Sequence, residues 1–341
     1  MTSATYRKII VACLLFPAVS GCHKEDLATP GEHSRRDANG FLPPVSPSGL
    51  TATRMTPFAE TGLTDGENVV YCPTYALAWK SYFGDATVKE FQENIVRDPF
   101  TLEDISAEDI RIVADADEHK VRKAREELGI DSRSPINPIH GNTYCAIRKS
   151  LPFHYDFERL PQPFRFHSDE AEIEVQAFGV TEHWDYWSIA LMRVRVIDYL
   201  SPDDFVIRIE NRKREEIILA RIPQPDSLRA GIEQVEARVA ASNLTGEHAF
   251  VANHEPFVVP VLEFSLLENF DGGSQLIQFR LDEKGAMLVS ESDVGMEGGF
   301  EPGERRFIFD KPFLLLLKES PENNPYLAAW IANGDLMMRP D

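Results

Sequence analysis

The 341-residue chain lacks the sequence motifs that mark common classes of enzyme. It has no Gly-x-Ser-x-Gly nucleophile elbow, no Walker phosphate-binding loop and no His-Glu-x-x-His zinc motif. Its nine histidines show no paired spacing of the kind that binds a metal. The sequence therefore predicts a protein that is not an enzyme, with no catalytic residues, no metal and no cofactor.

Positive charge is also scarce. The chain has 35 Lys and Arg residues against 55 Asp and Glu residues, which leaves a formal net charge of −20. An acidic surface repels nucleic acids and anionic lipid headgroups, and it favours solubility. We therefore expect no nucleic acid partner, and we expect the folded part to be a monomer.

Cysteine is rare, with four residues in the whole chain. Cys13 and Cys22 belong to the N-terminal segment, so only Cys72 and Cys145 remain for the folded part. In an exported protein these two could form a disulfide, but both lie among apolar residues, where free buried cysteine is also common. Both alternatives stay open from the sequence.

Apolar runs long enough to span a bilayer are absent as well. The apolar run at residues 9–16 is too short to do so. Arg7 and Lys8 precede it, and the small residues 19–21 separate it from Cys22. The pattern resembles a bacterial lipoprotein signal, in which cleavage before Cys22 exposes a cysteine that carries lipid. An ordinary secretory signal peptide is the alternative. Lipidation predicts a protein of the cell envelope that is held to its membrane by lipid alone, on the outer membrane if the cell is Gram-negative.

A segment rich in proline and glycine follows the signal peptide of residues 1–22. These residue types interrupt any helical or strand period throughout residues 23–64. We predict a flexible tether over residues 23–64, with a reach of roughly 35 Å, and a single domain over residues 65–341. A first helix within residues 49–60 is the alternative.

The rest of the chain shows helical signals first and strand signals afterwards. Ser106 and Asp109 resemble a capping box, which predicts a helix with Ile110, Ile112 and Val113 on its buried face. Runs of helices followed by runs of strands are typical of the α+β class. Other helices are predicted at residues 74–83, 117–128 and 228–239, and strands at residues 173–178, 189–197, 205–209 and 217–222.

Three short motifs carry more specific information. Residues 68–73 read Asn-Val-Val-Tyr-Cys-Pro. Residues 282–285 read Asp-Glu-Lys-Gly after an apolar strand-like run, and residues 310–313 read Asp-Lys-Pro-Phe within the next one. The long polar segment between the last two motifs is unusual for a compact domain, where such loops are functional or disordered.

These motifs resemble those of the serpin superfamily. That family has Asn-Val-Val-Phe-Ser-Pro ahead of its second helix, and an exposed reactive-centre loop between Asp-Glu-Lys-Gly and Asp-Lys-Pro-Phe. Residues 146–153, 175–179 and 258–264 also fall in serpin order. The resemblance implies an α+β, serpin-like fold with a large mixed β-sheet and a second, smaller sheet or barrel. Because the chain is much shorter than a serpin before residue 146, the helical subdomain is expected to be reduced.

The resemblance also implies the parts of an inhibitor. It places a reactive-centre loop at about residues 286–306 and its hinge at Glu283, Lys284, Gly285 and Ala286. In an inhibitory serpin a protease cuts the loop, and the loop then inserts into the central sheet as an extra strand. The expected partner of this chain is therefore a serine protease.

Counting along the family's loop places the scissile region at five residues, and none of them is basic. A trypsin-like protease, whose pocket needs a positive charge, is disfavoured on this ground. An elastase-like or chymotrypsin-like protease is the better match. The five residues are Met296, Glu297, Gly298, Gly299 and Phe300.

Two departures from the family support a second hypothesis. Cys72 and Gln275 stand where serpins have serine and histidine beneath the opening of the sheet, which changes the hydrogen bonds that let the sheet part. After Gly285 the chain has Met287 and Leu288 where serpins have small residues, and forcing bulky side chains into a packed core costs about 1–3 kcal/mol. The alternative to a serpin-type inhibitor is a non-inhibitory binding protein on a serpin-like scaffold.

Overall fold

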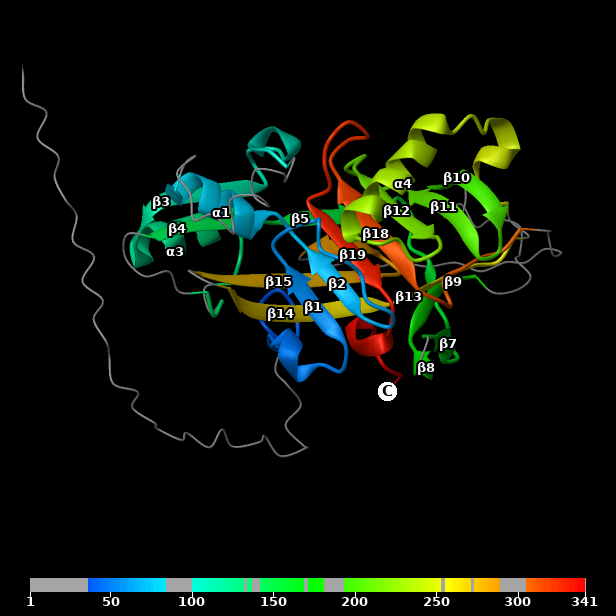
Figure 1. Ribbon diagram of the computed structural model, residues 1–341, viewed down its shortest axis with the longest axis horizontal. Coiled ribbons are helices and arrows are strands. Elements are labelled where there is room, and N and C mark those ends of the chain that lie inside the picture. Colours follow the sequence, from blue (N-terminus) through cyan, green and yellow to red (C-terminus); the bar gives the residue numbers. More distant parts are fainter. Residues whose placement is uncertain are drawn as a thin grey trace, which may run out of the picture. The chain divides into compact units, whose positions relative to one another are not determined.

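The structure is a computed structural model, and the tether residues 23–35, Cys22 and the predicted scissile residues 296–300 lie outside the residues that it describes (Figure 1). Within the described part of the chain, no helix is long and apolar enough to cross a bilayer. The described residues are 36–83, 100–131, 134–136, 142–168, 171–180, 193–252, 255–270, 273–288 and 305–340.

The largest sheet has seven strands and is mixed. Its first two strands run parallel, and every other neighbouring pair is antiparallel. Strand β18 (Phe313–Lys318) lies at its centre and is buried along its whole length, as a short continuous apolar run predicts. The strands on either side are, in order, β1 (Thr53–Thr56), β2 (Asn68–Tyr71) and β19 (Leu327–Ile331), and then β12 (Glu216–Arg221), β11 (Asp204–Ile209) and β10 (Val194–Ser201).

Helix α4 (Leu228–Ala241) covers one face of this sheet (Figure 1). The Ser227 side chain caps its first turn by accepting a hydrogen bond from the backbone. Leu228, Ile232 and Val235 then pack on the apolar side chains of β12, β18 and β19. The opposite face of the sheet contributes to the main hydrophobic core.

Two four-stranded sheets share that main core. The first has the order β14 (Leu262–Phe270), β15 (Gly273–Asp282), β16 (Gly285–Leu288) and β5 (Lys149–Pro152), and all its pairs are antiparallel. The second has the order β17 (Phe307–Ile308), β13 (Phe257–Pro260), β9 (Ala177–Val180) and β6 (Glu158–Arg159).

Two hairpins and two helices complete the described fold. Helix α3 begins at the cap Asp117 and ends at Gly129, which is in the left-handed conformation. It packs on β3 and β4, whereas α1 packs against β4 and β15 (Figure 1). These elements are α1 (Thr74–Phe83), β3 (Ile110–Ala116), α3 (Glu118–Leu128), β4 (Asn142–Ile147), β7 (Phe164–His167) and β8 (Glu172–Val175).

The predicted α+β class with a large mixed sheet is confirmed, and so are the helices predicted at residues 74–83, 117–128 and 228–239. The helix predicted after Ser106 is wrong. Residues 110–116 form β3, which pairs with β4. Instead of capping a helix, Ser106 donates its backbone N–H and its hydroxyl to Glu319 at 2.6 and 3.0 Å. A tertiary partner thus overrides the local capping signal.

The predicted tether also ends earlier than residue 64. Phe41 is fully buried, and β1 pairs in parallel with β2 of the large sheet. Arg36 forms an ion pair with the buried Glu263 of β14. Proline and glycine in this segment interrupt regular periods without preventing it from packing, so residues 36–64 belong to the domain.

Candidate functional site

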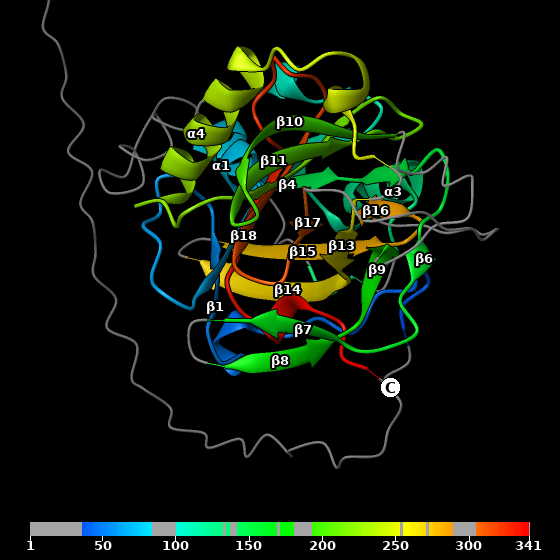
Figure 2. The same cartoon turned by 90° about the vertical axis from the view of Figure 1, so that its right-hand side faces the viewer.

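Strand β16 lies between two strands from distant parts of the chain (Figure 2). Its Ala286 is opposite Leu281 of β15 on one side and Leu151 of β5 on the other. Ala286 is only 2% exposed and belongs to the main core. Residues 286–288, predicted as the start of an exposed loop, are therefore a paired strand, and the predicted loop boundary is wrong at this end.

A tight turn joins β15 to β16 and contains the predicted hinge. The Asp282 carboxylate accepts a hydrogen bond from the backbone N–H of Lys284 at 2.9 Å, and burial raises the pKa of Asp282. The carbonyl oxygens of Glu283 and Lys284 accept hydrogen bonds from Phe157 at 2.8 Å and Phe153 at 2.9 Å. The hinge is thus fixed to the segment that follows β5.

Glu283 also ties the hinge to a second sheet. Its carboxylate accepts a hydrogen bond from Nε of Arg159, in β6, at 2.8 Å. Both side chains are mostly buried, which strengthens a charge-assisted hydrogen bond relative to an exposed pair. No sequence pattern pointed to Arg159, because it meets Glu283 only through the arrangement of the sheets.

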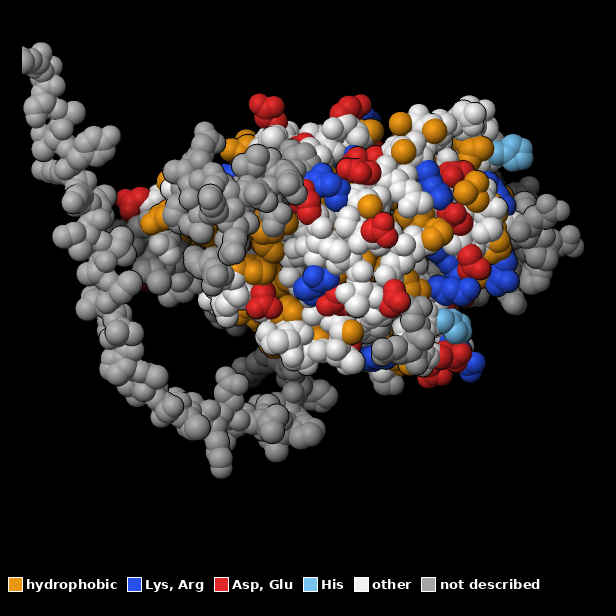
Figure 3. Space-filling model, in the orientation of Figure 1, with side chains coloured by type: hydrophobic (Ala, Val, Ile, Leu, Met, Phe, Trp, Pro, Cys, Tyr) orange, Lys and Arg blue, Asp and Glu red, His pale blue; other side chains and the backbone are white. Residues whose placement is uncertain are grey.

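Beyond β16 the sheet parts and leaves a cavity of about 590 Å³ between β15 and β4, which we call the slot. Residues 273–279 of β15 pair with β14 alone, and β4 pairs with β3 alone, among the described strands. Two strand edges therefore face each other across the slot, and none of the described strands lies between them. Figure 3 shows hydrophobic side chains gathered between α1 and the strands β14 and β15, whereas charged side chains of both signs are scattered over that face.

Gln275 lies on the core side of the slot. Its amide nitrogen donates to the carbonyl oxygen of Cys72 and to the hydroxyl of Thr74, each at 2.8 Å. Its amide oxygen is buried and has no hydrogen-bond partner among the described residues. The sequence placed Cys72 and Gln275 beneath the opening of the sheet, and the structure brings them together there. A buried acceptor without a donor is costly, so it marks a position where a further group would be stabilised.

Arg148 borders the slot on the other face of the sheet. Its guanidinium donates to the carbonyl oxygen of Leu128 at the end of α3, at 2.7 Å. Burial lowers the pKa of Arg148, and no described carboxylate forms an ion pair with it. On the same face Arg125 of α3 lies over the ring of Tyr144 at 5.7 Å. Two guanidinium groups, those of Arg125 and Arg148, therefore lie where α3 packs on β4.

The two remaining cysteines border the slot as free thiols. Burial raises the pKa of both Cys72 and Cys145, and the neighbouring Cys72 raises that of Cys145 further. A thiol held protonated is a poor nucleophile and a poor metal ligand. The question left open by the sequence is answered, because the two thiols are not joined in this structure.

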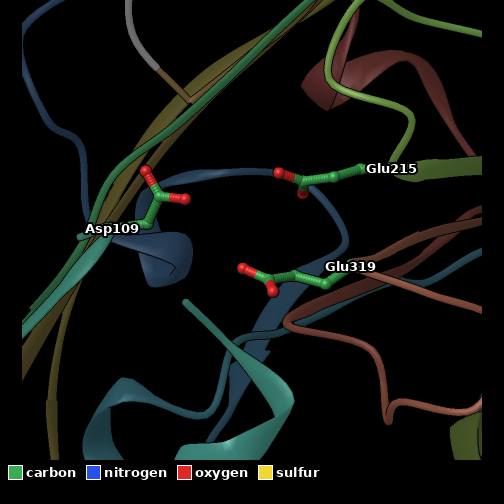
Figure 4. Close-up of side chains that lie close together, drawn as sticks. All are labelled: Asp109, Glu215 and Glu319. Carbon is green, nitrogen blue, oxygen red and sulfur yellow. The ribbon is translucent and has the colours of Figure 1, made fainter. Parts of the chain in front are cut away.

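Three carboxylates converge near β5, from Asp109, Glu215 and Glu319 (Figure 4). One oxygen of each lies within 4.8 Å of the others, a spacing that would suit a metal ion. The Lys149 ammonium already lies among them, at 2.9 Å from Asp109 and 3.0 Å from Glu215, and it also donates to Glu319. The cation that these carboxylates hold is the chain's own lysine.

The carboxylates and the lysine control each other's ionisation. Burial disfavours the charge of Lys149, but hydrogen bonds to Glu319 and Asp109 and the charge of Glu215 outweigh it, so its pKa is raised. Burial raises the pKa of Glu215, whereas hydrogen bonds from Lys149 and Ser106 lower that of Glu319. Lys149 is opposite Leu288, the last residue of β16. This cluster therefore anchors β5 at the mouth of the slot.

The predicted site residues fall into two groups. Glu283, Lys284, Gly285 and Ala286 lie together at the turn above the slot, and their role as a hinge stays a prediction. Cys22 and residues 296–300 stay predictions. Arg159, Arg148 and Lys149 were missed, because a single charged residue in a strand shows no local sign of its distant partners.

Among the comparisons with known proteins, only those with solved structures give matches. No protein-family model and no curated protein sequence matches the chain. The chain is similar to solved serpin structures. A highly specific serpin of the insect Tenebrio molitor is 12% identical, with 78% of this chain and 92% of that chain covered and a TM-score of 0.42. A serpin of the trematode Schistosoma haematobium is 12% identical, with 79% and 94% covered and a TM-score of 0.43.

Human thyroxine-binding globulin, in complex with its hormone, is a further similar structure. It is 11% identical, with 79% of this chain and 93% of that chain covered and a TM-score of 0.48. Similarity at this level indicates nothing about ligand or activity, so the function below is inferred from the chain's own motifs and slot.

Proposed function

We propose that the protein is a serpin-type inhibitor of a serine protease, with the segment between β16 and β17 as the bait. The observation that supports this proposal most directly is the half-filled sheet. Strand β16 occupies the upper end of the gap between β15 and β5, and the slot continues the same gap between β15 and β4. Cleavage of the bait would free β16 to extend into the slot. There the facing edges of β15 and β4 are not paired with any described strand.

The pairing of β16 fixes the register of that extension. In an extension with the register of β16, each further residue would lie one position back along both neighbouring strands. Residue 289 would then be opposite Gln278 of β15 and opposite Arg148. Residue 294 would be opposite Gly273, the first residue of β15, and opposite Thr143 of β4. Residues 289–294 therefore match the length of the slot.

The side chains of this segment suit the two faces of the sheet. Ala286 faces the core, and alternation along a strand places Ser290, Ser292 and Val294 on the same face. These side chains are small. The bulky residues 287 and 288 already belong to β16 in the intact chain, so insertion after cleavage does not have to place them. The cost of forcing bulky side chains into the packed core, which the sequence led us to expect, is thereby reduced.

Six inserted residues would form new backbone hydrogen bonds with two strands, each worth on the order of 1 kcal/mol net. A gain of several kcal/mol corresponds to a rise in melting temperature of roughly 10–20 °C for a domain of this size. We expect this rise when the bait is cut by an elastase-like or chymotrypsin-like protease. Thermal unfolding of cut and uncut protein, followed by circular dichroism, measures it.

Inhibition needs a second measurement, because insertion alone does not show that a protease is trapped. The soluble domain, mixed with such proteases, is expected to form a covalent complex that survives boiling in detergent. Clean cleavage with a raised melting temperature but no complex would mean that the cut bait inserts into the sheet without trapping the protease. Clean cleavage with no rise would favour the non-inhibitory binding protein.

We further propose that Cys22 carries lipid and holds the domain at the envelope membrane. Its support is the N-terminal pattern of a short basic segment, a short apolar run and small residues before Cys22. The variant Cys22→Ser should move the protein from the membrane fraction to the soluble exported fraction, because a protein without acyl chains has no stable anchor. Immunoblots of the separated fractions test this. Cys13→Ser is the control and should stay in the membrane fraction, and membrane retention of Cys22→Ser would refute the anchor.

A further inference from the structure

We infer that residues 36–41, which we call the clasp, join the two sides of the slot and restrain its opening in the uncut protein. The inference concerns the slot of the intact chain, so it goes beyond the proposed inhibition and does not rest on it. Its starting point is a path of hydrogen bonds that runs from β15 through the clasp and the end of α3 to the residue between β4 and β5.

One part of the clasp is bound to β14 and β15 by buried charges. The Arg36 guanidinium pairs with the carboxylate of Glu263, which also accepts a hydrogen bond from Arg280 at 2.8 Å. Burial alone would raise the pKa of Glu263, but the two guanidinium groups outweigh it, so its pKa is lowered. Arg280 also donates to the carbonyl oxygen of Gly40 at 2.6 Å, and its guanidinium lies 5.5 Å from the centre of the fully buried Phe41 ring. The clasp is therefore fixed to this side of the slot.

A β-turn within the clasp carries the path onward from β15. The backbone N–H of Gly40 donates to the carbonyl oxygen of Asp37 at 3.0 Å, which closes the turn. One oxygen of the Asp37 carboxylate accepts hydrogen bonds from the backbone N–H groups of Asn39 and Phe41, each at 2.9 Å. Its other oxygen accepts from the side chain of Gln278, a slot-lining residue of β15, at 3.1 Å. An aspartate that bonds to its own backbone in this way fixes the shape of the turn.

The second residue of the turn is bound to the other side of the slot. The backbone N–H of Ala38 donates to the carboxylate of Asp131 at 2.8 Å. Asp131 lies two residues beyond Gly129, the cap of α3, and α3 packs on β3 and β4. Arg148, the residue after β4, donates to the carbonyl oxygen of Leu128 at 2.7 Å and so holds the end of this helix. Of the three hydrogen bonds between segments in this path, only the one between Ala38 and Asp131 is exposed.

The exposed bond is the one that opens most easily. When a hydrogen bond in contact with water breaks, both of its groups find water as a new partner, so the net loss is small. The clasp can therefore release Asp131 while Arg36 and Phe41 keep it attached to β14 and β15. Release would let β15 and β4 move apart, because no ladder among the described strands joins them along residues 273–279.

The chain carries its own reporters of this opening. The free thiols of Cys72 and Cys145 both line the slot. We would alkylate the native full-length chain with N-ethylmaleimide and follow each thiol separately by mass spectrometry of the digested protein. Ala38→Pro should raise the rate at both thiols about 5-fold, because it removes the hydrogen bond to Asp131. Proline suits the second position of a β-turn, so the substitution deletes the N–H and keeps the turn.

Three further variants complete the test. Asp131→Ala removes the acceptor of the same bond and should raise both rates to a similar extent. The double variant of Ala38→Pro and Asp131→Ala should react no faster than either single variant, because both remove one interaction. Ala38→Ser keeps the backbone N–H and is the matched control, so its rates should equal those of the wild type.

The dependence on urea separates opening of the slot from unfolding of the whole domain. A local opening exposes little surface, so the rates in wild type and variants should change little at low concentrations of urea. A steep rise with urea would show that the thiols react through global unfolding, and it would overturn the clasp. Equal rates in wild type, Ala38→Pro and Asp131→Ala would overturn it as well. All rates are measured on uncut protein, so neither result bears on the proposed insertion of the bait.

Discussion

Replacing Lys149 by methionine should destabilise the protein by about 3–5 kcal/mol, the cost of leaving buried charges without their partner. The Lys149 side chain is 1% exposed and donates to Asp109, Glu215 and Glu319. Methionine fills a similar volume, so the loss reports on charge rather than on packing. Chemical unfolding of Lys149→Met and wild type at neutral pH measures the difference in free energy.

A matched exposed pair provides the control. Lys311 lies 2.9 Å from Asp203, but both side chains are about half exposed or more. Lys311→Met should cost less than about 1 kcal/mol, as exposed ion pairs usually do. Comparable losses in Lys149→Met and Lys311→Met would show that the buried cluster has no special role in stability.

The loss in Lys149→Met should also shrink as the pH falls. Without the ammonium, burial raises the pKa of Glu215 and Glu319, so the variant takes up protons on folding and becomes more stable as the solution is acidified. In the wild type the pKa of Glu319 is lowered, so its contribution is present at neutral pH and is lost as the pH falls. The two stability curves should therefore approach each other between about pH 7 and about pH 5. A gap that widens on acidification would contradict this account.

Gly285→Ala should cost about 2–3 kcal/mol and release β16 from the sheet. Gly285 has a φ of +152°, which side chains rarely adopt. A Cβ there would lie 2.5 Å from the carbonyl oxygen of Leu151 and 2.8 Å from Cα of Pro152, and both are backbone atoms that β5 holds in place. Chemical unfolding measures the loss, and hydrogen exchange at residues 285–288 should show faster exchange.

Gly246 is the matched control for this substitution. It also has a positive φ, of +61°, but a Cβ there would have nothing within 4 Å. Gly246→Ala should therefore show only the backbone cost of about 1 kcal/mol and no change in exchange at β16. Equal losses in the two variants would mean that the close contact with β5 does not matter.

Local sequence patterns were enough to predict those helices and strands that are marked by an uninterrupted run of residues of one kind or by capping residues at both ends. The capped helix at residues 118–128 has a polar cap and a left-handed glycine at its ends, and the apolar run at 313–318 can only be stable as a buried strand. The capping signal at Ser106 failed because a distant carboxylate, Glu319, takes the same hydrogen-bond donors. Capping boxes and tertiary contacts use identical groups, and local sequence does not distinguish them.

The order of the sequence motifs determined the α+β class and the predicted places of the hinge and the bait, because these depend on residues close together in the chain. Tertiary structure alone decided where the hinge strand lies and what surrounds it. The pairing of β16 with both β15 and β5, the slot beneath it and the burial of Lys149 among three carboxylates each join segments far apart in sequence. Such contacts depend on strand register and on the packing of sheets, and these are properties of the whole fold.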